Sequence, residues 1–142
     1  MTFRSSNRAN ILALLVFTAA CATDSPMSPG SMLAFGAWGG DAAQVVTSTT
    51  TTHVLLGCTF GDFPGNITLD ANGRFAVNGS WNPSVGPIQQ NATMPAQMSG
   101  QVVGATLTFA IAVNDTIRKQ VTSLGPQSAE FGKQASVVVC PL

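Results

Sequence analysis

Residues Thr106–Val113 read TLTFAIAV, and this stretch decides the fold. Bulky apolar side chains stand at every second position, and Thr or Ala fills the positions between them. An alternation with a period of two is typical of a β-strand that buries one face and exposes the other. The stretch therefore predicts a strand whose buried face consists of Leu107, Phe109, Ile111 and Val113.

The same alternation continues on either side of this strand. Residues 75–81 place Phe75, Val77, Gly79 and Trp81 on one face. The segment 70–73 (DANG) predicts the hairpin turn that precedes this strand, because its Gly can adopt the left-handed conformation. A second tight turn is expected at 103–106, between strands at 97–103 and 106–113. Further strands are predicted at 43–50, 52–60, 127–131 and 135–139, the last two as a closing hairpin around Gly132-Lys133.

Short strands separated by turn signals about every 8–12 residues are typical of an all-β sandwich or barrel. Residues 34–142 show no convincing helical period and hold about eight or nine such strands. A long antiparallel sheet removes its exposed edges by closing on itself. We therefore predict an all-β fold in which residues 34–142 form a small antiparallel meander, closed into an eight- or nine-stranded barrel.

The first twenty residues differ from the rest of the chain. Arg4 and Arg8 lie in a polar start without acidic residues, and the apolar run 11–17 (ILALLVF) follows. This run is shorter than the roughly 18–20 residues that span a bilayer, so it is typical of a cleaved signal peptide. We predict a signal peptide at residues 1–20 and a flexible tether at 21–33.

The end of the predicted signal peptide allows two kinds of processing. Residues 18–21 (TAAC) resemble the bacterial lipobox, in which small residues precede a Cys that is lipidated and becomes the new N-terminus. This resemblance implies a lipidated Cys21, a membrane as partner and a cell-envelope location on a membrane surface. The alternative is ordinary secretion, because Ala20-Cys21-Ala22 also matches an A-x-A site with cleavage after Ala22.

The number of cysteines bears on this choice. The chain has three Cys, and an odd number in an exported protein leaves one without a partner. Lipidation of Cys21 accounts for that residue and leaves Cys58 and Cys140 as a predicted disulfide. The alternative, two buried free thiols, suits an oxidising compartment less well.

Charged residues are scarce throughout the chain. Only 8% of the 142 residues are charged, and six basic and six acidic side chains give a formal net charge of zero. Soluble domains usually carry about 25% charged residues, so uncharged polar side chains must supply the surface. Nucleic acid is excluded as a partner, because its binding requires a basic stripe. Removal of residues 1–20 takes away Arg4 and Arg8 and leaves a net charge of −2.

Five features occur in order along the chain: 36–41 (GAWGGD), 58–61 (CTFG), 67–75 (ITLDANGRF), Ser99-Gly100 before the strand centred on Leu107, and Cys140. Together they resemble a family of small, uncharacterised bacterial exported proteins. Its members share a W-G-G start, a Cys in the second strand, a D-A-x-G-x-F hairpin and a final Cys. The resemblance implies a fold and a compartment but no activity.

The Gly-x-Trp at 36–38 is also similar to the entry of lipocalin-like barrels and of small barrel inhibitors of bacterial metalloproteases. This similarity implies a lipocalin-like barrel in which Trp38 closes one end of the core. Four further aromatic residues, like Trp38, either pack in the core or line a barrel mouth that binds a small apolar ligand: Phe60, Phe63, Phe75 and Trp81.

No catalytic constellation is visible in the sequence. The chain has one His, His53, and its six acidic residues are spread without the spacing of a metal or phosphate site. We therefore expect no catalytic residue, no metal and no cofactor. The sequence predicts a non-enzymatic envelope lipoprotein with a structural role or an envelope protein as partner. The alternatives are a barrel that binds a small apolar ligand and an inhibitor of an exported protease.

Overall fold

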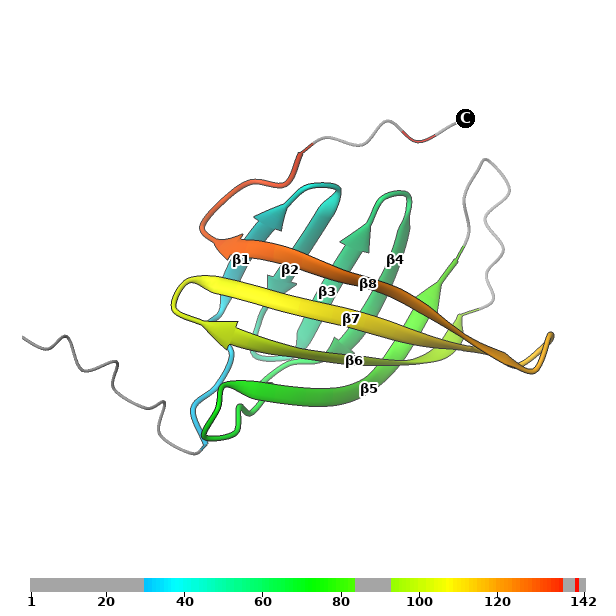
Figure 1. The fold of residues 1–142 in the computed structure, drawn as a ribbon, viewed down its shortest axis with the longest axis horizontal. Coiled ribbons are helices and arrows are strands. Elements are labelled where there is room, and N and C mark those ends of the chain that lie inside the picture. The colour runs from blue at the N-terminus through cyan, green and yellow to red at the C-terminus, as the bar shows by residue number, and fades with distance from the viewer. Residues whose placement is uncertain (1–29, 84–92, 137–139, 141–142) are drawn as a thin grey trace, which may run out of the picture.

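The computed structural model describes residues 30–83, 93–136 and 140. The predicted signal peptide, the predicted lipidation site Cys21 and residues 137–139 lie outside the described residues. The described chain is all-β, and eight antiparallel strands close into a barrel in which each strand pairs with the next and the last pairs with the first (Figure 1). The strands are β1 (Gly36–Gly40), β2 (Ala43–Thr47), β3 (Thr51–Leu56), β4 (Thr59–Pro64), β5 (Arg74–Asn82), β6 (Met94–Val103), β7 (Thr106–Asp115) and β8 (Gln120–Phe131).

The predicted barrel is thus confirmed, and so is its central strand. β7 contains the whole alternating stretch, and its four predicted inward side chains are at most 5% exposed. β6 pairs with β7 from Val103↔Thr106 to Ala96↔Val113, which confirms the tight turn between them. The face predicted for residues 75–81 also lies inward, with Phe75 and Trp81 buried.

The prediction of one strand at 52–60 is wrong. The segment forms two strands, because the chain turns at Gly57 and Cys58 between β3 and β4. Gly57 has a φ of +57°, a left-handed conformation that glycine adopts without steric cost. The apolar run on either side of Gly57 hid this turn. The break between the strands predicted at 43–50 and 52–60 falls at residues 48–50. There the hydroxyl oxygen of Ser48 accepts hydrogen bonds from the amides of Thr50 and Thr51.

The predicted closing hairpin is also wrong. β8 runs over twelve residues and pairs along its length with β7, from Asp115↔Gln120 to Thr106↔Glu130. The register of this pair shifts between Phe109 and Ile111. Residues 133–136, the start of the expected last strand, have no strand structure and instead cross the barrel wall. The described structure therefore ends its sheet at Phe131.

The segment 36–41 also differs from its prediction as an entry to the first strand, because residues 36–40 form β1 itself. The hairpin predicted at 70–73 forms its turn, with the amide of Asp70 donating to the carbonyl of Arg74 at 2.9 Å. Its first arm, however, lies outside the barrel sheet, where Thr68 forms an isolated bridge with Met32.

Residues 31–33 and 67–69 close the gap beside β5. β4 and β5 pair over only three residues, Phe60–Asp62 with Ser80–Asn82. Where this short pairing has ended, the Leu33 amide donates to the Ile67 carbonyl and the Leu69 amide donates to the Ser31 carbonyl. Leu33, Ile67 and Leu69 are all at most 3% exposed. The folded region therefore includes the last residues of the segment expected to be a tether.

The interior of the barrel is filled by its own side chains. Trp38, Trp81 and Phe109 are each at most 2% exposed. The rings fit because glycines on neighbouring strands leave room for them. A Cβ at Gly61 would collide with the Trp81 indole, and one at Gly79 would lie 2.5 Å from the Phe63 ring. Interiors are close-packed, so these glycine positions set the size of ring that the core accepts.

The contact between Gly61 and Trp81 can be tested by substitution. Gly61→Ala adds a methyl group against the indole and 2.6 Å from the Ser80 carbonyl oxygen. We expect the free energy of unfolding, measured by urea denaturation, to fall by about 1–3 kcal/mol. Combining it with Trp81→Leu should cost less than the two single changes together, since the two sites are coupled.

Ala76→Val is the matched control, because Ala76 lies on the exposed face of β5. It should change the stability by less than about 0.5 kcal/mol. Equal stability of the Gly61→Ala and Ala76→Val variants would contradict the packing described here.

Candidate functional site

The chain after β8 crosses the outer wall of the barrel as a strap, which we define as residues 132–136 with Cys140. The amide of Gly132 donates to the Ala37 carbonyl at 2.8 Å, and the amide of Ser136 donates to the Gly40 carbonyl at 3.1 Å. The Ser136 hydroxyl also donates to the Asp41 carboxylate at 3.2 Å. The strap is therefore held on β1 and on the turn that follows it.

Gly39 allows the strap to lie directly on the barrel wall. A Cβ at this position would approach the strap backbone, at 2.5 Å from the carbonyl carbon of Gln134 and 2.6 Å from the amide nitrogen of Ala135. The neighbouring Trp38 points the opposite way, into the core. The Trp-Gly sequence thus places a large ring inside and bare backbone outside at the same point of β1.

The far end of the strap is joined to the barrel by a disulfide. Cys140 bonds to Cys58, with a Cα–Cα distance of 5.6 Å and 82 residues between them in sequence. Cys58 lies in the turn between β3 and β4, and Gly57 in the same turn donates its amide to Ala42 at 2.7 Å. The predicted pairing of these two cysteines is confirmed.

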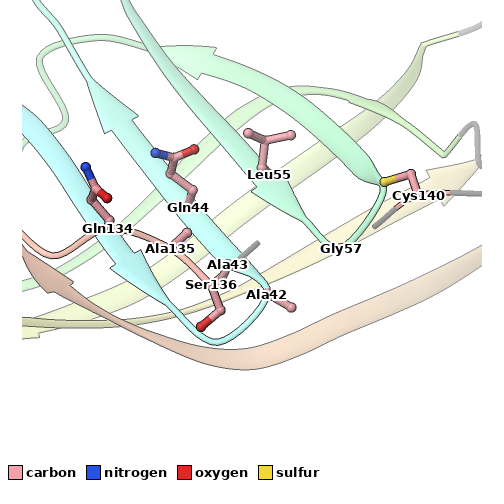
Figure 2. Close-up of a pocket in the computed structure, with 9 residues that line it drawn as sticks. All are labelled: Ala42, Ala43, Gln44, Leu55, Gly57, Gln134, Ala135, Ser136 and Cys140. Atoms are coloured by element: carbon pink, nitrogen blue, oxygen red, sulfur yellow. The ribbon is translucent and has the colours of Figure 1, made fainter. Parts of the chain in front are cut away.

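An open hollow of about 430 Å³ lies between the strap and the outer wall of β2 and β3 (Figure 2). In Figure 2, the side chains of Gln44, Leu55 and Gln134 are directed to the same side of the sheet. The lining is neutral and combines amides, a hydroxyl and small apolar groups, so it suits a neutral ligand that both accepts and donates hydrogen bonds. The lining residues are Ala42, Ala43, Gln44, Leu55, Gly57, Gln134, Ala135, Ser136 and Cys140.

His53 and Asp62 form a pair on the same outer wall. They are cross-strand neighbours on β3 and β4, and His53 Nδ1 lies 2.7 Å from Asp62 Oδ1. Both side chains are exposed to solvent, and the Phe60 ring lies 5.8 Å from the imidazole. The pair orients the imidazole, since a carboxylate fixes the ring nitrogen that it contacts.

The aromatic residues singled out from the sequence occupy two places. Trp38, Phe63, Phe75 and Trp81 lie in the core and are at most 7% exposed. Phe60 instead lies on the outer wall, because Gly61 and Phe63 take the inward positions of β4. The rings therefore do not form one cluster. Within the described residues, no group of three His, Cys, Asp or Glu could hold a metal ion.

Comparison with known proteins adds no relative. No family, no curated protein and no solved structure matches this chain. In residues 30–83, 93–136 and 140, no helix has the length and apolar character needed to cross a membrane. The sites above are therefore interpreted from their own chemistry.

The contact between the strap and β1 can be tested by substitution of Gly39. Gly39→Val should displace the strap, because the new side chain occupies the space of the Gln134–Ala135 backbone. We expect faster trypsin cleavage after Lys133, a strap residue whose amide bonds to Glu130 in the native fold. Mass spectrometry after reduction measures the nick, since the disulfide would retain the cleaved peptide.

Ala37→Val is the control, because Ala37 is an exposed residue on the same face of β1. Its cleavage rate should equal that of the wild type. If Gly39→Val is cut no faster than Ala37→Val, the close contact between β1 and the strap is not what seats the strap.

Proposed function

We propose that this protein is a non-enzymatic, lipid-anchored protein of the cell envelope that binds a protein partner through the outer wall of its barrel. The observation that carries the proposal is the filled interior. The rings of Trp38, Phe63, Phe75 and Trp81 pack within the space that an internal ligand would need. A barrel filled in this way offers its outer surface for recognition.

The N-terminal sequence supports the anchor. The basic start, the short apolar run and the small residues before Cys21 suit export followed by lipidation of that cysteine. Each buried CH₂ of an acyl chain contributes about 0.8 kcal/mol, so more than one chain gives stable anchoring. An acylated Cys21 would hold the barrel at a membrane surface without a spanning helix.

The outer wall of β2, β3 and β4 is the recognition surface that we propose. Val46 lies beside His53 in the cross-strand register, and Leu55 lies beside Phe60. This places the His53–Asp62 pair next to the strap hollow on one continuous face. Partly exposed aromatic and apolar groups are typical of protein interfaces. The contact between His53 Nδ1 and Asp62 Oδ1 holds the imidazole in place beside them.

A small ligand in the strap hollow is the second candidate. The volume of about 430 Å³ lies within the range of small-molecule sites, roughly 300–1,000 Å³. The hollow is on the barrel wall, so this candidate differs from a ligand held inside the barrel. Saturable protection of the strap from trypsin by a neutral ligand would favour it over a protein partner.

The anchor can be tested by intact mass. The protein extracted from membranes should begin at Cys21 and carry acyl mass, and Cys21→Ser should move the protein to the soluble fraction. Cys21 takes no part in the Cys58–Cys140 bond, so the wild type and Cys21→Ser should both keep that bond. An unmodified N-terminus, or cleavage after Ala22, would favour the secreted form instead.

The recognition surface can be tested by affinity purification after cross-linking in the native envelope. We expect the wild type to retain a defined partner. The double variant His53→Ala/Phe60→Ala should recover about tenfold less of that partner, which corresponds to a loss of about 1.4 kcal/mol in binding free energy. Thr108→Ala on β7 is the matched control, because Thr108 is exposed and lies on another wall. Equal recovery with both variants would contradict the proposed surface.

A further inference from the structure

β8 is much longer than the strand that closes the barrel against it. Its pairing with β7 runs from Gln120 to Glu130, whereas β1 pairs only with Glu130 and Phe131. Figure 1 shows the β7–β8 hairpin extending beyond the other strands. Ser128 still lies against Gly40 of β1. Among the described residues, the stretch 120–125 has a paired strand on one side alone.

Residues 120–124 of this edge come before the two features that interrupt it, the register shift opposite Phe109 and Ile111 and the proline at position 126. Native edges are blunted by charged side chains, especially Lys, by Pro or by being very short. Residues 120–125 (QVTSLG) carry no charge, and Val121 among them is 68% exposed. Pro126 lacks an amide hydrogen and interrupts the edge only after these six residues. With respect to residues 30–83, 93–136 and 140, the segment 120–125, which we call the β8 edge, is therefore open to another strand.

We propose that the β8 edge pairs with the β8 edge of a second copy of this chain, in antiparallel orientation about a two-fold axis near Thr122. Antiparallel pairing of one edge with itself satisfies the backbone groups of both copies by the same contacts, as a two-fold interface requires. The uncharged sequence places no like charges opposite each other across the axis. An uncharged edge is thus compatible with an identical partner.

The charges at the two ends of β8 favour the antiparallel orientation. Arg118 and Lys119 precede the strand, and Glu130 lies near its end. An antiparallel pair about Thr122 keeps the cationic ends of the two copies apart and places Lys119 and Arg118 opposite the uncharged residues 125 and 126 of the partner strand. A parallel pair would bring the cationic ends together. This charge pattern therefore favours the antiparallel orientation that the two-fold axis requires.

The hairpin that carries the edge is already ordered in the single chain. The Asp115 carboxylate accepts hydrogen bonds from the amides of Ile117 and Arg118, at 2.9 and 2.8 Å. Arg118 Nε lies 3.9 Å from the other carboxylate oxygen. Pairing therefore needs little further ordering of the chain, which lowers the cost of association.

Cysteine cross-linking in the full-length exported protein tests the proposal. Thr122→Cys and Ser123→Cys are made separately, so that a small shift of the axis is tolerated. At least one should give a species of twice the monomer mass on non-reducing gels, lost on reduction. Thr108→Cys is the control, because Thr108 is also exposed but lies on β7, away from the edge. It should stay monomeric.

Sedimentation equilibrium of the full mature protein in detergent gives the second measurement. Wild type should contain two chains per particle, Val121→Lys should contain one, and Thr108→Lys should keep two. A monomeric wild type, or dimers that Val121→Lys leaves intact, would overturn the proposal. A cross-link from Thr122→Cys to a different protein would also overturn it, in favour of a foreign strand on the same edge.

Discussion

Closure of the barrel depends on a short seam between β1 and β8. The two strands share only the pairs Trp38↔Phe131 and Gly39↔Glu130. At the first pair, the rings of Trp38 and Phe131 meet edge to face with their centroids 5.0 Å apart. Aromatic pairs of this kind contribute about 0.5–1.5 kcal/mol beyond the area they bury. The Trp38 indole also donates to the Ala34 carbonyl at 3.3 Å, so the ring that seals the seam has its polar atom satisfied.

The strap reinforces this seam from outside. It leaves β8 at the seam and lies against Gly39, and its Cys140 is bonded to Cys58. The bond closes a loop of 82 residues, for which the chain-entropy estimate is about 4–5 kcal/mol. This is a large share of the roughly 5–15 kcal/mol by which a domain is stable. The weakest contact of the sheet is therefore covered by the part of the chain that is covalently held.

A strand of this protein can be predicted from the sequence when one of its faces is buried and the other is exposed. β7 alternates strictly because one face fills the core, and its period was readable without a structure. β8 is exposed over most of its length, so no alternation marks it, and Gly125-Pro126 within it resembles a turn. The strap hollow could not be predicted either, since it joins residues as distant in sequence as Ala42 and Ser136. The disulfide was predictable because counting cysteines needs no geometry.

Glycines allow close packing on both sides of the barrel wall. Inward-facing Gly61 and Gly79 make room for the rings of Trp81 and Phe63, whereas Gly39 leaves room on the outside for the strap. Glycine thus lets large rings pack in the interior and lets the strap pack on the outer wall. The rings of Trp81 and Phe63 occupy the space that a side chain at Gly61 or Gly79 would need. The Trp-Gly pair in β1 is a structural device of the same kind, because Trp38 packs in the core and Gly39 lets the strap lie on the outer wall.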